Sequence, residues 1–334
     1  MKSRILKSRT TLIASALGLA LVHPAVSFSQ VVLTANDAIG TSSFNATGSW
    51  SPAGAPSAGN TYSTLGYLLR SPATAGSYTF AGDSLTIGGG DGGGANPFSP
   101  TTANNNALIF KASAVTLTVN NLILDGAQIR DGNGDGSYTT LNGNIFVTAN
   151  GGSFLAQDTN IVNSAISGSG PIYIGNNGNG SAARVIVFTS GLSTYNGDIL
   201  MDNGGNVANS RLIFSSGSVM NYSIGANGVN NNISGAGTLT LDGTFNFDLS
   251  NAGNNVGDSW NIVDSSVAAT YDPTFAVAGF TQNGTLWDGN ANGVGYQFDT
   301  TSGQLSVMAV PEPTTLAICG LGFAGLLAFK RRKK

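Results

Sequence analysis

Oxygen-bearing side chains near the C-terminal end have the spacing of ligands in a calcium-binding loop. Asp288, Asn290 and Asn292 occupy alternate positions before Gly293, and Asp299 stands at the twelfth position. Calcium loops of this kind use oxygen ligands at alternate positions, a glycine at the sharp bend and a closing bidentate acid. We expect an ordinary Asn/Gly turn at these residues, and a Ca²⁺ site formed by them is the alternative. No other cofactor is expected.

A second string, which begins at Asp131, has the same opening but lacks the closing acid. Asp131-Gly132-Asn133-Gly134-Asp135-Gly136 places oxygen ligands at alternate positions, yet the twelfth residue is Asn142. Neither string is flanked by residues that favour helices, and Asn/Gly-rich chains produce such strings by composition alone. We therefore expect a plain turn here as well, and the Asp131 string is the weaker of the two calcium candidates.

The residue types that most enzyme mechanisms need are missing from residues 30–308. The sole histidine is His23, the sole cysteine is Cys319 and the sole glutamate is Glu312. This excludes nucleophilic triads and zinc sites built on His or Cys from that region, and it also excludes disulfides there. The aspartates show no spacing that places two at one site, so no enzymatic activity is expected. Aspartate with Ca²⁺, acting on a polysaccharide, is the enzymatic alternative.

The charge balance of residues 30–308 limits the partners. This region holds sixteen aspartates and five basic residues, so its net charge is near −11, although the whole chain has a formal charge of −3. Such a surface cannot neutralise a run of phosphates, so nucleic acid is not expected as a partner. The five basic residues are Arg70, Lys111, Arg130, Arg184 and Arg211.

The C-terminal end combines a proline motif, an apolar run and a basic cluster. Pro311-Glu312-Pro313 precedes the uncharged run 314–329, which as a helix would span roughly 24 Å. A hydrocarbon core about 30 Å thick is somewhat longer, and snorkelling basic side chains can cover part of the difference. The pattern predicts a transmembrane helix with its basic end in the cytoplasm. The expected membrane anchor residues are Thr314, Leu316, Ile318, Leu321, Phe323, Leu326, Leu327 and Phe329, and the stop-transfer residues are Lys330, Arg331, Arg332, Lys333 and Lys334.

In order and position, these features resemble the PEP-CTERM sorting signal of exported proteins in Gram-negative, biofilm-forming bacteria. The resemblance implies that Pro311, Glu312 and Pro313 are recognised by exosortase, a membrane transpeptidase that removes the helix and passes the protein on to the surface. It also implies a place on the cell surface or in the extracellular polysaccharide matrix. An ordinary membrane anchor behind a proline-rich spacer is the alternative.

The N-terminal end has the pattern of a secretory signal peptide. Four basic residues lie within the first nine, and Thr11–Val22 is apolar. Small residues then permit cleavage before Phe28 or Gln30. The apolar stretch is too short to span a membrane, so residues 1–29 are expected to direct export by the Sec machinery. The central part of the chain would then lie in the periplasm, anchored to the inner membrane, before delivery to the surface.

The central part is expected to be all-β. It is rich in Gly, Asn, Ser and Thr, and short apolar runs of alternating pattern recur between Gly/Asn clusters. A right-handed parallel β-solenoid with antiparallel capping structure is the favoured architecture, and a β-sandwich is the alternative. The segment 166–174 recurs as 233–241, a spacing of about three coils. Asn/Asp-Gly pairs are expected to supply positive-φ corners; these are Asp125-Gly126, Asn142-Gly143, Asn196-Gly197 and Asp242-Gly243.

The two Ile-Ser-Gly-x-Gly copies and the segment 189–198 resemble the repeats of autotransporter-associated β-strand proteins. The resemblance implies a right-handed parallel β-helix of the kind found in secreted adhesins and surface proteins. The expected division of the chain is a signal peptide at 1–29, an N-terminal β cap at 30–104, solenoid repeats at 105–243, a C-terminal β cap or small sandwich at 244–308 and the sorting signal at 309–334.

The function expected from these features is that of a non-enzymatic structural protein of the surface or matrix. A glycan-binding module is a further alternative, and it would need an exposed platform of aromatic side chains. The candidates for such a platform are Trp50, Tyr62, Tyr195 and Tyr222, although aromatic residues of β-proteins more often belong to the core.

Overall fold

The computed structural model describes residues 29–89, 106–132, 137–176, 184–191, 194–201 and 210–308. Every regular element within these ranges is a β-strand, so the predicted all-β class is confirmed. No helix in the same ranges is long and apolar enough to cross a membrane. The predicted membrane helix lies outside the described residues, and so does the predicted signal peptide except for Ser29, which begins the first strand.

The largest sheet has 13 strands. All of its pairings are parallel except that between β1 and β2. Its strands are β1 (Ser29–Leu33), β2 (Trp50–Ser51), β3 (Asn60–Ser63), β5 (Gly76–Thr79), β6 (Ser84–Gly88), β8 (Val115–Asp125), β10 (Tyr138–Val147), β12 (Thr159–Gly168), β14 (Val185–Phe188), β15 (Thr194–Tyr195), β17 (Arg211–Phe214), β20 (Gly237–Leu241) and β23 (Val267–Tyr271).

Three smaller sheets complete the described structure. A seven-stranded parallel sheet contains β4 (Leu69–Arg70), β7 (Ala107–Phe110), β9 (Ala127–Asp131), β11 (Gly152–Ala156), β13 (Ile172–Asn176), β16 (Ile199–Met201) and β19 (Ile233–Gly235). A three-stranded parallel sheet contains β18 (Val219–Ser223), β21 (Thr244–Asp248) and β24 (Ala276–Val277). A five-stranded antiparallel sheet contains β22 (Ser259–Asn261), β25 (Thr281–Asn283), β26 (Leu286–Ala291), β27 (Val294–Asp299) and β28 (Gln304–Val307).

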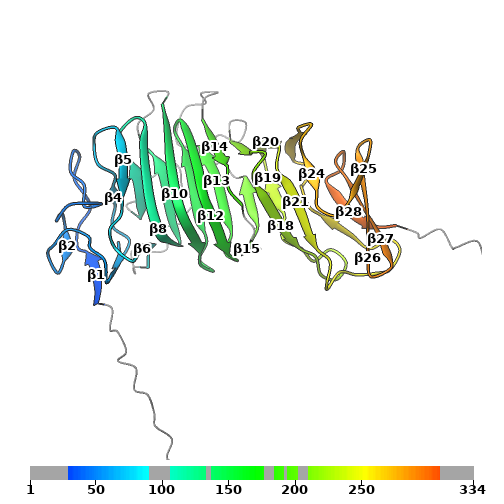
Figure 1. Cartoon of the computed structure of the whole chain (residues 1–334), viewed down its shortest axis with the longest axis horizontal. Coiled ribbons are helices and arrows are strands. Elements are labelled where there is room, and N and C mark those ends of the chain that lie inside the picture. Colours follow the sequence, from blue (N-terminus) through cyan, green and yellow to red (C-terminus); the bar gives the residue numbers. More distant parts are fainter. Residues whose placement is uncertain are drawn as a thin grey trace, which may run out of the picture.

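From β7 to β14 the chain alternates strictly between the two largest sheets. Each visit adds a strand in parallel beside the strand of the previous visit, so the strands follow one another along the long axis of the molecule (Figure 1). We call one passage through both sheets a circuit. Hydrogen-bonded side chains on successive circuits are 21 residues apart at Asn142 and Asn163 and 26 apart at Asn163 and Thr189.

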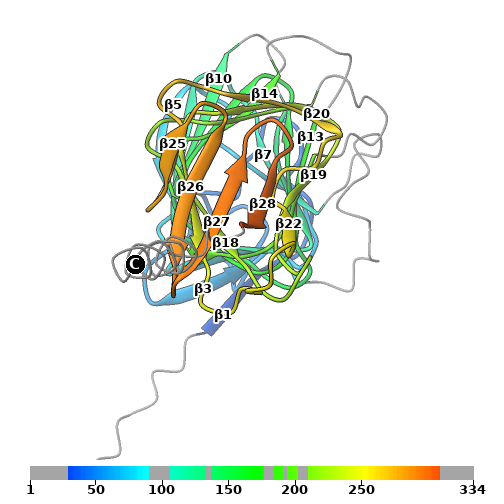
Figure 2. The ribbon, with the colours of Figure 1, turned by 90° about the vertical axis from the view of Figure 1, so that its right-hand side faces the viewer.

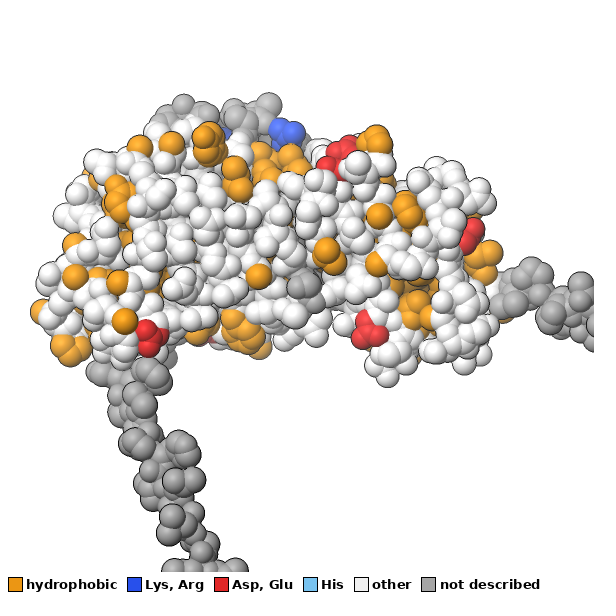
Figure 3. All heavy atoms as spheres, viewed as in Figure 1, with side chains coloured by type: hydrophobic (Ala, Val, Ile, Leu, Met, Phe, Trp, Pro, Cys, Tyr) orange, Lys and Arg blue, Asp and Glu red, His pale blue; other side chains and the backbone are white. Residues whose placement is uncertain are grey.

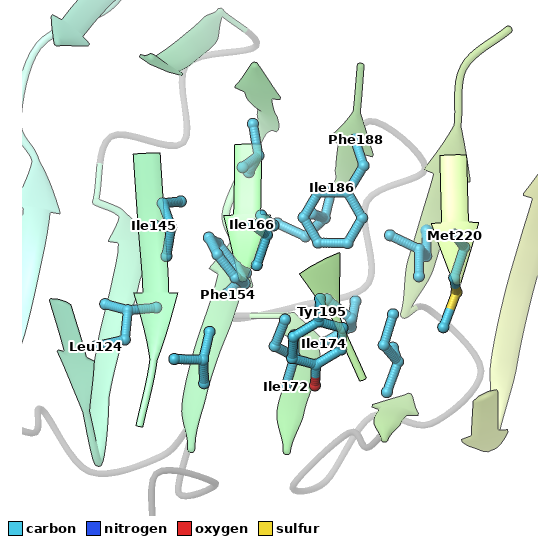
Figure 4. Close-up of a cluster of buried hydrophobic side chains, with 14 of the residues drawn as sticks. Leu124, Ile145, Phe154, Ile166, Ile172, Ile174, Ile186, Phe188, Tyr195 and Met220 are labelled. Atoms are coloured by element: carbon cyan, nitrogen blue, oxygen red, sulfur yellow. The ribbon is translucent and has the colours of Figure 1, made fainter. Parts of the chain in front are cut away.

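The core consists of apolar rows that run from circuit to circuit. Because the strands are parallel and in register, an inward residue on one circuit lies beside an inward residue on the next. Phe188 packs edge-on against Phe154 of the opposite sheet, with ring centroids 5.7 Å apart, and at 5.5 Å from Phe214 of the next circuit. Figure 4 shows Phe154 and Phe188 among the aliphatic side chains between the sheets. One such row, fully or almost fully buried, consists of Leu117, Leu141, Val162, Phe188, Phe214 and Leu241.

The two Ile-Ser-Gly-x-Gly copies do not occupy equivalent places, so the prediction that they lie about three coils apart was wrong. Ile166 belongs to β12 in the largest sheet, whereas Ile233 belongs to β19 in the seven-stranded sheet. Ile233 is in register with Ile199, which is in register with Ile172 at the far end of the first copy. The spacing between the copies is therefore not a whole number of circuits.

The shared motif encodes a corner rather than a position within a circuit. Gly168 and Gly235 both have positive φ, at 106° and 96°, and each is the last residue of its strand. A Cβ at Gly168 would collide with the carbonyl oxygen of Val147 on the preceding circuit. The motif thus supplies one buried apolar side chain and then a glycine that turns closely beside the previous circuit, and both large sheets have such corners.

The four predicted Asn/Asp-Gly corners are only partly confirmed. Gly126 follows β8 with a positive φ of 68°, as expected. Gly143 also has positive φ but lies inside β10, where the register shifts by one residue against β8. Gly197 and Gly243 do not have positive φ. A Cβ at Gly243 would collide with Ser218, so that glycine is needed for close approach of two circuits rather than for a corner.

The stretch 244–308, predicted as a C-terminal β cap, contains both kinds of strand pairing. β21, β23 and β24 continue the parallel sheets, while β22 and β25–β28 form the antiparallel sheet. Figure 2 shows this antiparallel sheet lying across the end of the molecule. Phe298 of β27 packs against Phe245 and Phe247 of β21, with ring centroids 5.8 and 5.6 Å apart. The cap is therefore joined to the last parallel strands by aromatic contacts.

The stretch 30–104, predicted as an N-terminal β cap, also contributes parallel strands. β1, β3 and β6 extend the largest sheet, and β4 begins the seven-stranded sheet. Trp50, Tyr62 and Phe80 form a buried aromatic cluster, in which Tyr62 lies 5.1 Å from each of the other two rings. Phe44 joins the cluster through Phe80.

Replacing Phe188 with alanine is expected to destabilise the protein strongly. Phe188 is almost fully buried and contacts rings on the opposite sheet and on the next circuit, so its removal leaves a cavity. A Phe→Ala change in a core typically costs about 3–5 kcal/mol in unfolding free energy. Chemical denaturation of the wild type and of Phe188→Ala measures the difference.

The neighbouring Thr189→Ala variant is the matched control. Thr189 loses only an exposed side-chain hydrogen bond to Asn163, so its cost should be about 1 kcal/mol or less. Equal unfolding free energies for the two variants would contradict the placement of Phe188 in a packed row.

Candidate functional site

The residues predicted to bind calcium form a β-hairpin. Asp288 and Asn290 lie along the extended strand β26, and Asp299 ends β27. Asn292 and Gly293 make the turn between the strands, with φ values of 53° and 80°. Two successive residues of positive φ are typical of a two-residue hairpin turn. The geometry therefore matches the expected Asn/Gly turn more closely than a loop wrapped around an ion.

The two hairpin carboxylates are held by separate sets of partners. Asp288 accepts a hydrogen bond of 2.8 Å from the side-chain amide of Gln297 on the facing strand. Asp299 accepts from the main-chain N–H of Thr301 at 2.8 Å and from the hydroxyl of Ser302 at 3.0 Å. In the described parts of the chain, no three acidic, His or Cys side chains are grouped so that they could hold a metal ion. Calcium binding at this hairpin stays a prediction.

Asp131, the first residue of the other predicted calcium string, lies at the end of β9 and is almost fully buried. Residues 133–136 of that string fall outside the described residues. The structure therefore places only the start of this string.

Many aspartates stabilise turns through hydrogen bonds to nearby main-chain and hydroxyl groups. The Asp264 carboxylate accepts from the N–H of Ser266 at 2.8 Å and from its hydroxyl at 2.6 Å, and these bonds lower the pKa of Asp264. Asp248 is held by Ser250 in the same way, and its pKa is also lowered. Both carboxylates are thus favoured in the ionised form and bound to their own loops. Neither lies in an environment that would raise its pKa toward that of a general acid.

The four aromatic residues considered for a glycan platform are all buried, so they belong to the core, as aromatic residues of β-proteins more often do, and do not form such a platform. Trp50 and Tyr62 lie in the N-terminal aromatic cluster, and Tyr195 and Tyr222 are completely buried. All four lie in β-strands, as the all-β class predicts, but their side chains are on the inner faces of the sheets. The large aromatic side chains that the structure leaves exposed are Tyr67, Tyr138 and Phe146.

The outer face of the largest sheet carries a row of polar side chains that the sequence analysis did not predict. Thr118, Asn142 and Asn163 are in register on β8, β10 and β12. The Asn163 side-chain amide donates to the Asn142 side-chain oxygen at 3.1 Å, and the Thr189 hydroxyl donates to the Asn163 oxygen at 2.9 Å. A similar bond of 2.7 Å joins Asn246 to Asn221 on the three-stranded sheet. We call the row Thr118–Asn142–Asn163–Thr189 the amide row.

The surface around such rows is largely uncharged. On the face of the molecule drawn in Figure 3, most of the described surface belongs to neutral polar side chains and backbone, with only scattered charged groups. Tyr138 and Phe146, both exposed, lie at opposite ends of β10, which also contributes Asn142 to the amide row. A repeated spacing of outward Asn and Thr residues by one circuit is the sequence signal for this face.

The predicted recognition residues Pro311, Glu312 and Pro313 lie outside the described residues, as do the membrane anchor and stop-transfer residues that follow them. The family described as the PEP-CTERM protein-sorting motif matches the chain at residues 309–333. The chain carries a PEP-CTERM protein-sorting motif. The match covers the proline motif, the apolar run and all but the last residue of the basic cluster.

The sorting motif carries the functional information that the comparisons supply. It identifies this PEP-CTERM protein as an exported, membrane-anchored surface protein that is processed by an exosortase. No curated protein and no solved structure matches the chain. The resemblance of the central repeats to autotransporter-associated β-strand proteins stays a prediction.

Two buried tyrosines are expected to respond oppositely to removal of their hydroxyl groups. The Tyr195 hydroxyl lies 2.8 Å from the carbonyl oxygen of Gly170 and 2.7 Å from that of Asp198, so its single proton is shared between these two acceptors. The Tyr222 hydroxyl is buried without a hydrogen-bond partner. Burial raises the pKa of both phenols, so both stay neutral. Tyr195→Phe should cost about 1–2 kcal/mol, whereas Tyr222→Phe should be neutral or stabilising.

Thermal and chemical unfolding of both variants beside the wild type tests this expectation. The two substitutions remove the same atom from the same residue type, so each is the control for the other. A loss of stability in Tyr222→Phe as large as that in Tyr195→Phe would show that the Tyr222 hydroxyl has a partner.

Proposed function

We propose that this PEP-CTERM protein is a non-enzymatic structural component of the cell surface or the extracellular polysaccharide matrix. In this proposal the body is a right-handed parallel β-solenoid, closed by antiparallel β-structure and presented as a rigid rod. The observation that carries the proposal is the continuous parallel pairing of strands from β3 to β23, which joins successive circuits by main-chain hydrogen bonds. Such a scaffold is rigid without disulfides, and residues 30–308 contain no cysteine.

The carboxylates support a structural role rather than catalysis. Asp264, Asp248 and Asp299 accept hydrogen bonds from their own turns, and Asp288 is held by the facing strand. A polysaccharide-active enzyme using aspartate and Ca²⁺ would instead need several acids directed into one site. The described residues offer no group of three that could hold a metal ion.

The route to the surface follows from the two ends of the chain in this proposal. Residues 1–29 direct the protein to the Sec machinery, and the helix 314–329 holds it in the inner membrane with Lys330–Lys334 in the cytoplasm. The body then lies in the periplasm until exosortase acts at Pro311-Glu312-Pro313. The match to the sorting motif at residues 309–333 supports this order of events.

The mass of the mature protein tests the sorting step. We expect a form that ends near Pro311 in cells that contain their exosortase, and a form that retains the C-terminus through Lys334 in cells without it. Intact-mass spectrometry of protein recovered from both strains distinguishes the two. A Glu312→Ala variant should behave in the normal strain as the wild type does without exosortase.

Substitution of a charged residue outside the motif controls for non-specific effects. Asp299→Ala removes one carboxylate near the end of the body, and its mature mass should still show cleavage. An intact C-terminus in both strains for the wild type would contradict exosortase processing and leave a permanent membrane anchor.

Weak glycan binding by the amide-row face is a second candidate function. It is favoured by the exposed rings of Tyr138 and Phe146 on β10, beside outward amides that can bond sugar hydroxyls. Affinity electrophoresis in the matrix polysaccharide of the same cells should show retardation of the wild type and less retardation of Tyr138→Ser with Phe146→Ser. Tyr67→Ser, which removes an exposed ring from another part of the molecule, should migrate as the wild type. Equal migration with and without polysaccharide would exclude this candidate.

A further inference from the structure

Three of the five basic residues in the body lie together, although they are far apart in the sequence. Arg70 on β4 is in register with Ile109 on β7, and Ile109 is in register with Arg130 on β9. Lys111 follows β7 directly, and its ammonium group donates to the carbonyl oxygen of Gly132, just after β9, at 3.0 Å. We call Arg70, Lys111 and Arg130 the cation cluster.

The cation cluster lies on the outer face of the seven-stranded sheet. Leu69, Leu108 and Ile129 belong to the main core, and the residues that alternate with them point to the opposite face. Ile109, which separates the two arginines, belongs to a small apolar cluster distinct from the main core. The two guanidinium groups thus flank one apolar side chain on the same face.

This face is shielded from water at the cation cluster. Arg130 is only 9% exposed, and Ile109 and Leu155, which lie in register on either side of it, are each 4% exposed. Burial lowers the pKa of Arg130, and the positive charge of Arg70 lowers it further. Burial also lowers the pKa of Lys111, with both arginines adding to the effect. Like charges are therefore close together in a place where water screens them poorly.

Few acceptors satisfy these cations. The Arg70 Nε donates to the carbonyl oxygen of Asp37 at 2.9 Å. The Arg130 nitrogens are not among the buried side-chain atoms that lack a partner, so its guanidinium is not sealed from both solvent and acceptors.

The two carboxylates beside the cluster, Asp37 and Asp131, are not directed at its cations. Asp37 accepts from the main-chain N–H of Arg70 at 2.9 Å and from the N–H and hydroxyl of Ser43, so its oxygens are used to hold its own loop. Asp131 follows Arg130 in β9 and is in register with the core residue Phe110, so it faces the other side of the sheet. The negative charge of Asp131 partly opposes the lowering of the Lys111 pKa that burial and the two arginines cause.

We propose that the cation cluster is a binding site for one oxyanion, such as a sulfate or the carboxylate of an acidic sugar. Arg130 and Arg70 supply planar sets of donors that suit oxyanions, and Lys111 adds a further charge. The oxyanion accepts hydrogen bonds from these donors and offsets the repulsion between the cations. On a body with a net charge near −11, this is the place at which an anionic partner meets an excess of positive charge.

Calorimetry on the full chain in a neutral detergent tests the site with two probes, sodium sulfate and sodium glucuronate, each against sodium chloride at equal ionic strength. We expect saturable binding of at least one probe, weakened about tenfold or more in Arg130→Gln. Arg211→Gln removes the same charge from β17 of the other large sheet and should bind as the wild type. The stronger probe identifies the source of the oxyanion.

Thermal unfolding gives an independent readout. In chloride alone Arg130→Gln should melt at a higher temperature than the wild type, because it removes a largely buried cation that repels Arg70 and Lys111. Sulfate or glucuronate should raise the melting temperature of the wild type and of Arg211→Gln but not that of Arg130→Gln. The proposal is overturned by equal binding in the wild type and Arg130→Gln, by no saturable binding of either probe, or by a destabilised or unfolded Arg130→Gln in chloride.

Discussion

Main-chain hydrogen bonding between successive circuits is the interaction on which the rest of this structure depends. In the largest sheet, each strand on the path from β3 to β20 has a parallel neighbour on both sides, so its backbone donors and acceptors find partners without any help from disulfides. The same pairing fixes the register, and the register fixes the side-chain rows. The contact of Phe188 with Phe214 inside the body and the bond from Asn163 to Asn142 outside it both follow from this one ladder.

A ladder of this kind has two ends, and each must be protected because unpaired strand edges attract other chains. An aromatic cluster lies near each end. Trp50, Tyr62 and Phe80 form one cluster near the first strands, and Phe245, Phe247 and Phe298 join the antiparallel sheet to the last ones. Trp50 and Tyr62, which were considered for glycan stacking, are therefore buried because they contribute their area to the first of these clusters.

The sequence predicted the strand class well because period-2 alternation and the scarcity of helix-forming residues are local signals. It placed the repeated motif wrongly because the same motif makes a corner after Ile166 on the largest sheet and after Ile233 on the seven-stranded sheet. The motif itself does not indicate which of the two sheets the chain is leaving. The hairpin at Asn292 was misleading for a similar reason. A ligand spacing and a two-residue turn use the same Asn and Gly residues, and only the register of β26 against β27 separates them. The sorting motif needed no fold at all, since it is read as a short linear segment.

The positions of the charges could not be predicted, because register brings together residues that are distant in the chain. Arg70, Lys111 and Arg130 look scattered in the sequence, and they meet only because β4, β7 and β9 are neighbours. In such a sheet, an outward side chain lies beside the outward side chains of the circuits before and after it. Neutral Asn and Thr side chains can hydrogen-bond to one another in such a row, whereas neighbouring cations in a row repel one another. A scaffold that fills its outer rows with neutral amides, as at Asn142 and Asn163, obeys this constraint. A row that holds two arginines around Ile109 departs from it, and such departures from the local rule are where function is to be sought.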